Sequence, residues 1–76
     1  MNVDEQKLKE VMASILEVEV ADIRDDSSAD TIATWDSLHH INLIIALEQE
    51  FDVSLPDEDV AELSSYKLLL LTLQEL

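Results

Sequence analysis

Asp36, Ser37 and Leu38 place a carboxylate, a hydroxyl and an apolar side chain next to one another, directly before an apolar segment. We expect this segment to form a helix from about Ser37 to Phe51, so the triplet marks the amino end of the helix. Free backbone N–H groups and the helix dipole favour an anion there, and a phosphate attached to Ser37 would be well placed. The alternative is that Asp36 or Ser37 only caps the helix.

The helix that follows the triplet is apolar on two sides when its residues are placed at about 100° intervals on a wheel. One arc carries residues that we expect in the core: Leu43, Leu47 and Phe51. The roughly opposite arc carries three more apolar residues: Leu38, Ile41 and Ile45. Four short helices cannot enclose one of their number, so the second arc predicts an exposed contact patch. The alternative is that the long loop before the helix covers this arc.

The two histidines near Ser37 do not predict a catalytic or metal site. His39 is two residues from Ser37 on the same helix, which is poor geometry for a Ser-His-Asp triad, and no oxyanion loop is visible. Adjacent histidines point to different sides of a helix, so they make a poor metal pair. Helical spacing predicts His39 near Trp35 or Leu43 and His40 near Asp36 or Ile44.

Composition excludes several other kinds of site. The 76 residues include no cysteine and no glycine, which excludes disulfides, thiolate sites and Gly-rich phosphate loops. The acidic segment from about 19 to 35 lacks the central glycine and the spacing of an EF-hand calcium loop. The net charge of −14 argues against nucleic acid and anionic membrane as ligands. It favours partners with basic patches, unless the acids serve only solubility.

The elements that position the triplet are predicted to be helices. The tight hairpins of a β-sheet usually need turns with glycine, and this chain has no glycine. We expect helices at about 3–18, 37–51, 56–63 and 65–76, with Pro56 in the first turn of the third. A long first loop should be pinned to the bundle by four side chains: Val20, Ile23, Ile32 and Trp35. The prediction is an all-α, small four-helix bundle in which residues 1–76 form a single domain. With no secretory signal and no apolar run long enough to span a membrane, we expect a cytoplasmic protein.

The register of residues behind the triplet resembles the acyl carrier protein family. The resemblance is carried by these residues: Trp35-Asp36-Ser37-Leu38, Leu43, Leu47-Glu48, Glu50-Phe51 and Leu55-Pro56-Asp57. It implies that Ser37 receives a 4′-phosphopantetheine arm from coenzyme A through a magnesium-dependent phosphopantetheinyl transferase, and that Asp36 assists this modification. Intermediates would ride as thioesters on the thiol of the arm. The protein would be a carrier without catalytic residues.

The resemblance also implies a docking surface for partner enzymes. The positions that match it are Leu38, Ile41, Ile45 and Glu48. They would meet basic, apolar patches on the transferase, on loading enzymes and on downstream biosynthetic enzymes, with the carrier acting as a monomer. A rival interpretation from another class is an unmodified acidic adaptor that binds partners through the same helix.

Two departures from the family pattern predict a specialised pathway over housekeeping fatty-acid synthesis. Thr34-Trp35 stands where the family's fatty-acid members carry Gly-x, and His39, His40 and Asn42 stand where they carry acids. We therefore expect polyketide, aminoacyl, or surface lipid or sugar cargo. Trp35 either pins the loop to the bundle or contacts the arm. The leucine-rich core either admits an acyl chain between its helices or leaves the cargo outside.

Overall fold

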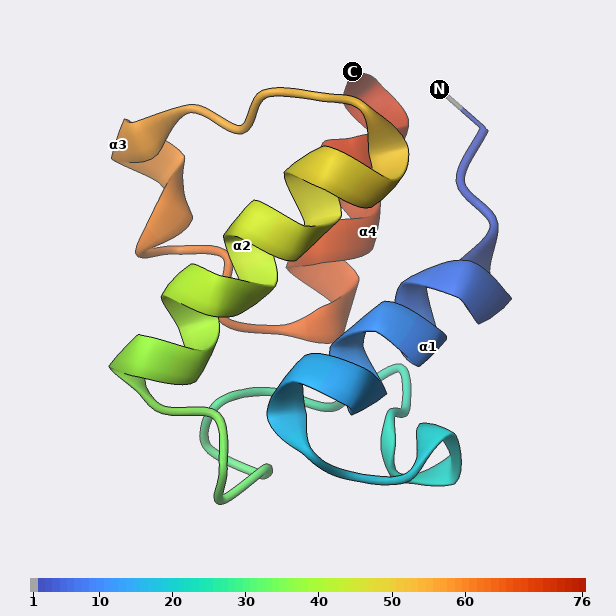
Figure 1. The fold of residues 1–76 in the computed structure, drawn as a ribbon, viewed down its shortest axis with the longest axis vertical. Coiled ribbons are helices and arrows are strands. Elements are labelled where there is room, and N and C mark those ends of the chain that lie inside the picture. Colours follow the sequence, from blue (N-terminus) through green and yellow to red (C-terminus); the bar gives the residue numbers. More distant parts are fainter. Residues whose placement is uncertain (1) are drawn as a thin grey trace.

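The computed structural model describes residues 2–76, apart from the side chain of Asp57, and leaves Met1 outside the description. Figure 1 shows the order of its elements, which are α1 (Glu5–Leu16), a 3₁₀ turn η1 (Val20–Asp22), α2 (Ser37–Phe51), α3 (Asp57–Val60) and α4 (Tyr66–Glu75). The described chain holds four α-helices and no strand beyond one isolated bridge, so the predicted all-α bundle with a long first loop is confirmed.

Short polar side chains begin three of the helices. Asp4 accepts the backbone N–H groups of Gln6 and Lys7 at the start of α1, and Ser65 accepts that of Leu68 at the start of α4. These caps satisfy donors that a helix leaves without an intrahelical partner. The amino end of α2 is described with the site below.

The predicted bounds are right for α2 and too long for α1 and α3. α1 stops at Leu16 because Glu17 turns into the left-handed region, with φ 61°. α3 covers only Asp57–Val60, where eight residues were expected. Beyond it the chain continues in tight turns, with the Leu63 N–H on the Val60 carbonyl at 3.2 Å, and this turn buries the Leu63 side chain.

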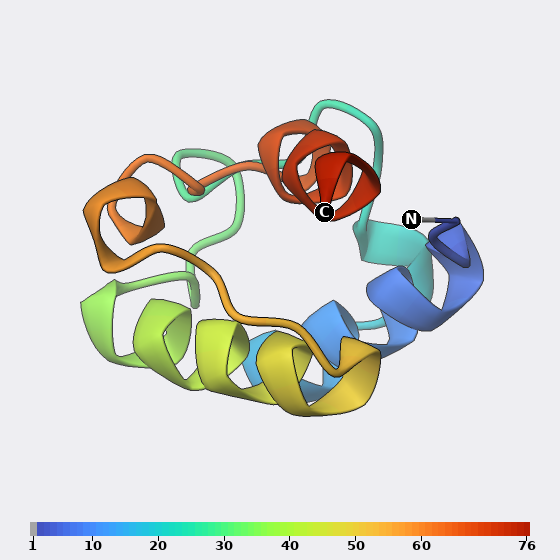
Figure 2. The same ribbon diagram turned by 90° about the horizontal axis from the view of Figure 1, so that it is seen from above.

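The core lies between α1, α2 and α4. Its fully buried aliphatic side chains, at 0% exposure, are Leu8, Met12, Leu16, Leu43, Leu47, Leu69 and Leu73. Seen from above in Figure 2, α2 and α4 lie on opposite sides of the molecule, with α1 at one end and α3 at the other. Within residues 2–76, none of the helices combines the length and the apolar character needed to cross a bilayer.

The long first loop is fastened to the bundle by side chains and by backbone pairing. Ile23, Ile32 and Trp35 are buried, as predicted, and Val20 is partly buried. Ser28 forms an isolated antiparallel bridge with Ser65, and the Ala29 N–H donates to the Ser64 carbonyl at 2.9 Å. This pairing holds the loop beside the chain that connects α3 to α4.

Candidate functional site

Asp36, and not Ser37, caps α2. Its backbone is extended, at φ −99° and ψ −175°, and its Oδ1 accepts the backbone N–H of His39 at 2.9 Å. Ser37 is therefore the first residue of the helix, and its side chain is exposed. None of the hydrogen bonds found among residues 2–76 uses the Ser37 hydroxyl. The cap thus leaves a free hydroxyl at the positive end of a fifteen-residue helix.

The carboxylate beside Ser37 is paired with the neighbouring histidine. Asp36 Oδ1 lies 2.7 Å from His39 Nδ1, and Glu17 Oε2 lies 3.6 Å from His39 Nε2. The backbone N–H of His39, followed by its side chain, lowers the pKa of Asp36 below its ordinary value. The same side-chain hydrogen bond raises the pKa of His39. Asp36 is thus held in its charged form next to the serine.

The ring contacts of the two histidines with Trp35 and Asp36 are the reverse of those that helical spacing predicts. The His39 ring contacts Asp36 and the His40 ring contacts Trp35, although the His40 backbone N–H donates to the Asp36 carbonyl at 2.9 Å. The expectation assumed helical geometry back through Trp35, but Asp36 is an extended cap. An N-cap side chain folds over the third residue of the helix, which here is His39.

His40 joins three parts of the chain through its two ring nitrogens. The Trp35 indole N–H donates to His40 Nδ1 at 3.0 Å, and His40 Nε2 lies 2.6 Å from the Val60 carbonyl oxygen. An indole nitrogen only donates, so Nδ1 must accept and Nε2 must carry the proton given to Val60. The half-buried ring is therefore held in one neutral tautomer between the loop, α2 and α3. No sequence signal could have identified this bridge, because Val60 is twenty residues away.

An open groove of about 500 Å³ lies beside Ser37. It is lined by residues of the loop, of α2 and of the segment from α3 onward: Ala29, Trp35, Asp36, Ser37, His40, Ile41, Val60, Ala61 and Ser64. Its volume is within the range of about 300–1,000 Å³ that small-molecule sites occupy. A slender group attached to Ser37 has room to lie along it. The residues present therefore fit a covalently held arm.

The second apolar arc of α2 is exposed, so the alternative in which the loop covers it is wrong. Leu38 is 66%, Ile41 53% and Ile45 48% exposed, and all three lie on the helix that Ser37 begins. Glu48 is half-buried, and its Oε2 accepts the Leu55 N–H at 2.8 Å. This carboxylate therefore holds the turn after α2, in addition to the docking role that the sequence predicts for it.

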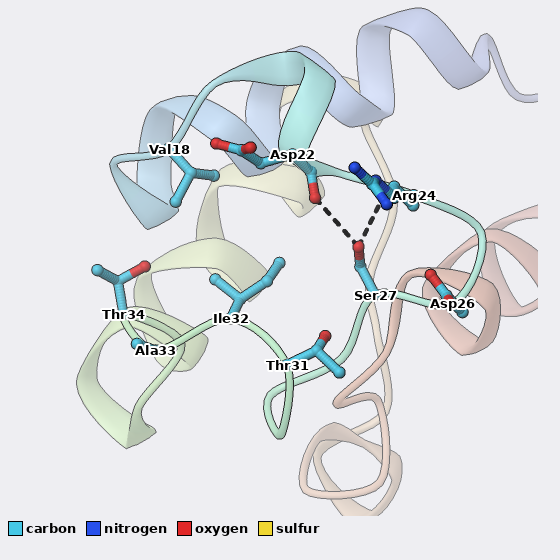
Figure 3. A pocket seen from close by; sticks show the side chains of 9 residues that line it. All are labelled: Val18, Asp22, Arg24, Asp26, Ser27, Thr31, Ile32, Ala33 and Thr34. Atoms are coloured by element: carbon cyan, nitrogen blue, oxygen red, sulfur yellow. Dashed lines mark hydrogen bonds between the residues drawn. The ribbon is translucent and has the colours of Figure 1, made fainter.

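A second pocket, of about 450 Å³, lies in the first loop (Figure 3). Its buried Ser27 is fully engaged, since its Oγ accepts the Arg24 N–H at 2.7 Å and donates to the Asp22 carbonyl at 3.3 Å. Across residues 2–76, no cluster of three His, Cys, Asp or Glu side chains has the arrangement to hold a metal ion. The polar groups of Ser27, Arg24 and Asp22 stabilise the loop, so we take the groove beside the free Ser37 hydroxyl as the candidate site.

Comparison with known proteins agrees with this geometry. A family model described as "Phosphopantetheine attachment site" matches residues 6–73. An acyl carrier protein of Buchnera aphidicola subsp. Schizaphis graminum is 37% identical over 65 residues, which cover 86% of this chain and 82% of the relative. An acyl carrier protein of Clostridium acetobutylicum is 38% identical over 60 residues, which cover 79% and 78%. The matched range contains all of α2 and the whole lining of the groove.

Proposed function

Because the chain belongs to the acyl carrier protein family, whose cofactor is a covalently attached 4′-phosphopantetheine, we propose that Ser37 carries this arm. The protein is a carrier of acyl intermediates and not an enzyme. One observation supports Ser37 most strongly. Its hydroxyl is exposed and free of hydrogen bonds within residues 2–76, and it opens onto a groove that can accept the arm.

The residues around Ser37 have distinct tasks in this proposal. Asp36 holds the start of α2 in place and, as a carboxylate beside the hydroxyl, assists the modification. On attachment, the Ser37 oxygen loses its proton and forms a bond to the phosphorus that carries the pantetheine arm of coenzyme A. The pyrophosphate bond of coenzyme A breaks at that phosphorus, and the adenine nucleotide part leaves with its remaining phosphates. The positive end of α2 then stabilises the resulting phosphodiester. The attached arm supplies a thiol, which a chain without cysteine cannot provide itself.

Carrier domains of this family work with a phosphopantetheinyl transferase and with biosynthetic enzymes. For this chain we assign the docking surface to α2, where three exposed apolar side chains follow Ser37: Leu38, Ile41 and Ile45. Glu48 lies one turn beyond them. The net charge of −14 favours basic rims around the apolar patches of the partners. We further propose that residues 1–76 form a single domain and that the protein is a monomer in the cytoplasm.

The pathway we propose is a specialised one, with polyketide, aminoacyl, or surface lipid or sugar intermediates. The support is the charge pattern at the start of α2, where His39 pairs with both Asp36 and Glu17. The Asp36 side chain raises the pKa of His39 and so favours its protonated form, which reduces the negative charge next to the attachment point. A partner enzyme that recognises a uniformly acidic start of α2 would therefore bind this carrier less well.

The test is to incubate the protein with coenzyme A, magnesium and a broad-specificity phosphopantetheinyl transferase, and then to measure its intact mass. We expect a gain of one phosphopantetheine, which Ser37→Ala abolishes and Ser54→Ala, at another exposed serine, leaves unchanged. Trp35 fluorescence should change on attachment because its ring lines the groove. An unchanged mass with several transferases would contradict the proposal and favour the unmodified adaptor.

A further inference from the structure

His40 lies where the groove beside Ser37 meets the interior of the bundle. Its ring is a wall of the groove, and both of its nitrogens are hydrogen-bonded to other walls. Trp35, on one side, is only 4% exposed. Val60, on the other, is the last residue of α3, and its carbonyl is one that a helix end leaves available for outside donors. One side chain therefore ties the loop and α3 to α2 along the groove.

α3 depends on contacts from the rest of the chain, and the hydrogen bond from His40 is one of them. It has four residues, and no side chain caps its amino end. Isolated helices this short are unstable, so contacts from the rest of the chain must hold α3 in place. The hydrogen bond from His40 and the buried neighbours Leu55 and Leu63 are such contacts.

We propose that His40 is a latch that closes the groove toward the core, and so determines which cargo the carrier can hold. This inference rests on the attachment of the arm at Ser37. The hydrogen bond between His40 and Val60 joins α2 to the end of α3, so an acyl chain that enters the core between these two helices at this point has to part Val60 from His40. That movement breaks the hydrogen bond to Val60, and displacing the ring also leaves the buried Trp35 N–H without its acceptor, which is unfavourable.

The latched groove suits a short cargo better than a long acyl chain, because it is open to solvent and the arm itself occupies part of it. Its lining combines apolar residues, among them Ile41 and Val60, with the hydroxyl-bearing Ser37 and Ser64. A long chain held there would leave most of its methylenes in water, because the apolar interior lies beyond the His40 ring. His40 therefore acts as a specificity-determining residue through Trp35 and Val60, without taking part in chemistry.

The experiment loads the protein with acetyl or octanoyl cargo, using the matching acyl-coenzyme A and the same transferase, and checks loading by intact mass. Each loaded form is then melted. With the latch in place, the acetyl and octanoyl forms should have nearly equal Tm values. In His40→Ala the octanoyl form should melt higher, by at least about 3 °C for each methylene that enters the core.

Two variants separate the latch from a general loss of packing. His39→Ala removes the neighbouring imidazole and keeps the Trp35–His40–Val60 bridge, so its two loaded forms should melt together as in the wild type. His40→Gln keeps an amide that can accept from Trp35 and donate to Val60, and should restore equal Tm values. If His40→Ala does not fold, His40→Leu, which fills much of the space of the ring but offers no acceptor to Trp35 and no donor to Val60, should show the octanoyl-dependent increase instead.

The outcomes of this experiment are distinct. Absence of any mass gain contradicts attachment at Ser37 and not the latch. A wild-type protein whose Tm rises with cargo length overturns the latch, whatever the variants do. A loaded His40→Ala protein whose Tm is independent of cargo length overturns it as well.

Discussion

The two faces of α2 carry the same kinds of side chain and have opposite environments. Leu43 and Leu47 are fully buried, whereas Leu38 is 66% and Ile45 48% exposed. The buried face packs against α1 and the rest of the core, and the exposed face belongs to the helix that begins at Ser37. Apolar character along α2 therefore serves folding on one face and, in our proposal, recognition of partners on the other.

The largest effect should come from breaking the buried face. Leu47→Ala removes a fully buried side chain and leaves a cavity, which should cost about 2–5 kcal/mol of unfolding free energy. A bundle of this size has only roughly 3–5 kcal/mol in total, so the variant should be largely unfolded or close to it. Urea denaturation followed by circular dichroism measures the loss.

The matched variant on the exposed face is Ile45→Ala. It should change the unfolding free energy by less than about 0.5 kcal/mol, because the side chain already contacts water. A loss comparable to that of Leu47→Ala would contradict the division of α2 into two faces. The same variant should slow phosphopantetheinylation about fivefold, if truncating an anchor of the docking surface costs about 1 kcal/mol.

Glu48 lies between the buried and the exposed face of α2, so its substitution tests whether it serves folding or docking. Its carboxylate accepts the Leu55 N–H, so Glu48→Ala should cost about 1–2 kcal/mol of unfolding free energy by leaving that donor unpaired. Glu48→Gln keeps an acceptor and should recover most of the loss. Full stability of Glu48→Ala in urea denaturation would place the residue wholly on the docking face.

The smallest effect concerns charge at the start of α2. His39 has a raised pKa in the fold, so its stabilising contribution is complete below the ordinary value of 6.5 and is lost as the pH rises through the folded-state pKa. Asp36 has a lowered pKa, so its contribution is present above the ordinary value of 3.8 and is lost as the pH falls through the folded-state pKa. An NMR titration of the His39 ring should show a pKa above 6.5 that moves down in Asp36→Asn. An unchanged titration in that variant would contradict the pairing.

The sequence by itself determined α2, both of its faces and the residue that begins it. Local signals were sufficient there, because the capping acid, the helical periodicity and the end of the apolar run all lie within the segment. The burial of Ile23, Ile32 and Trp35 was predictable for a similar reason, since isolated apolar residues in a polar loop have few alternatives to the core. The register from Trp35 to Asp57 also sufficed to identify the family.

Only the tertiary structure decided which partners the side chains around Ser37 have. The length of α3 could not be predicted, because a four-residue helix is stabilised by its contacts and not by its own sequence. The ring contacts of His39 and His40 differ from the predicted ones because the backbone of the cap residue Asp36 is extended. The bridge from Trp35 through His40 to Val60 forms only when α3 is placed against α2. The triplet at 36–38 thus predicts the residue to which we propose that the arm is attached, while the groove and its proposed latch arise from segments that meet only in the folded chain.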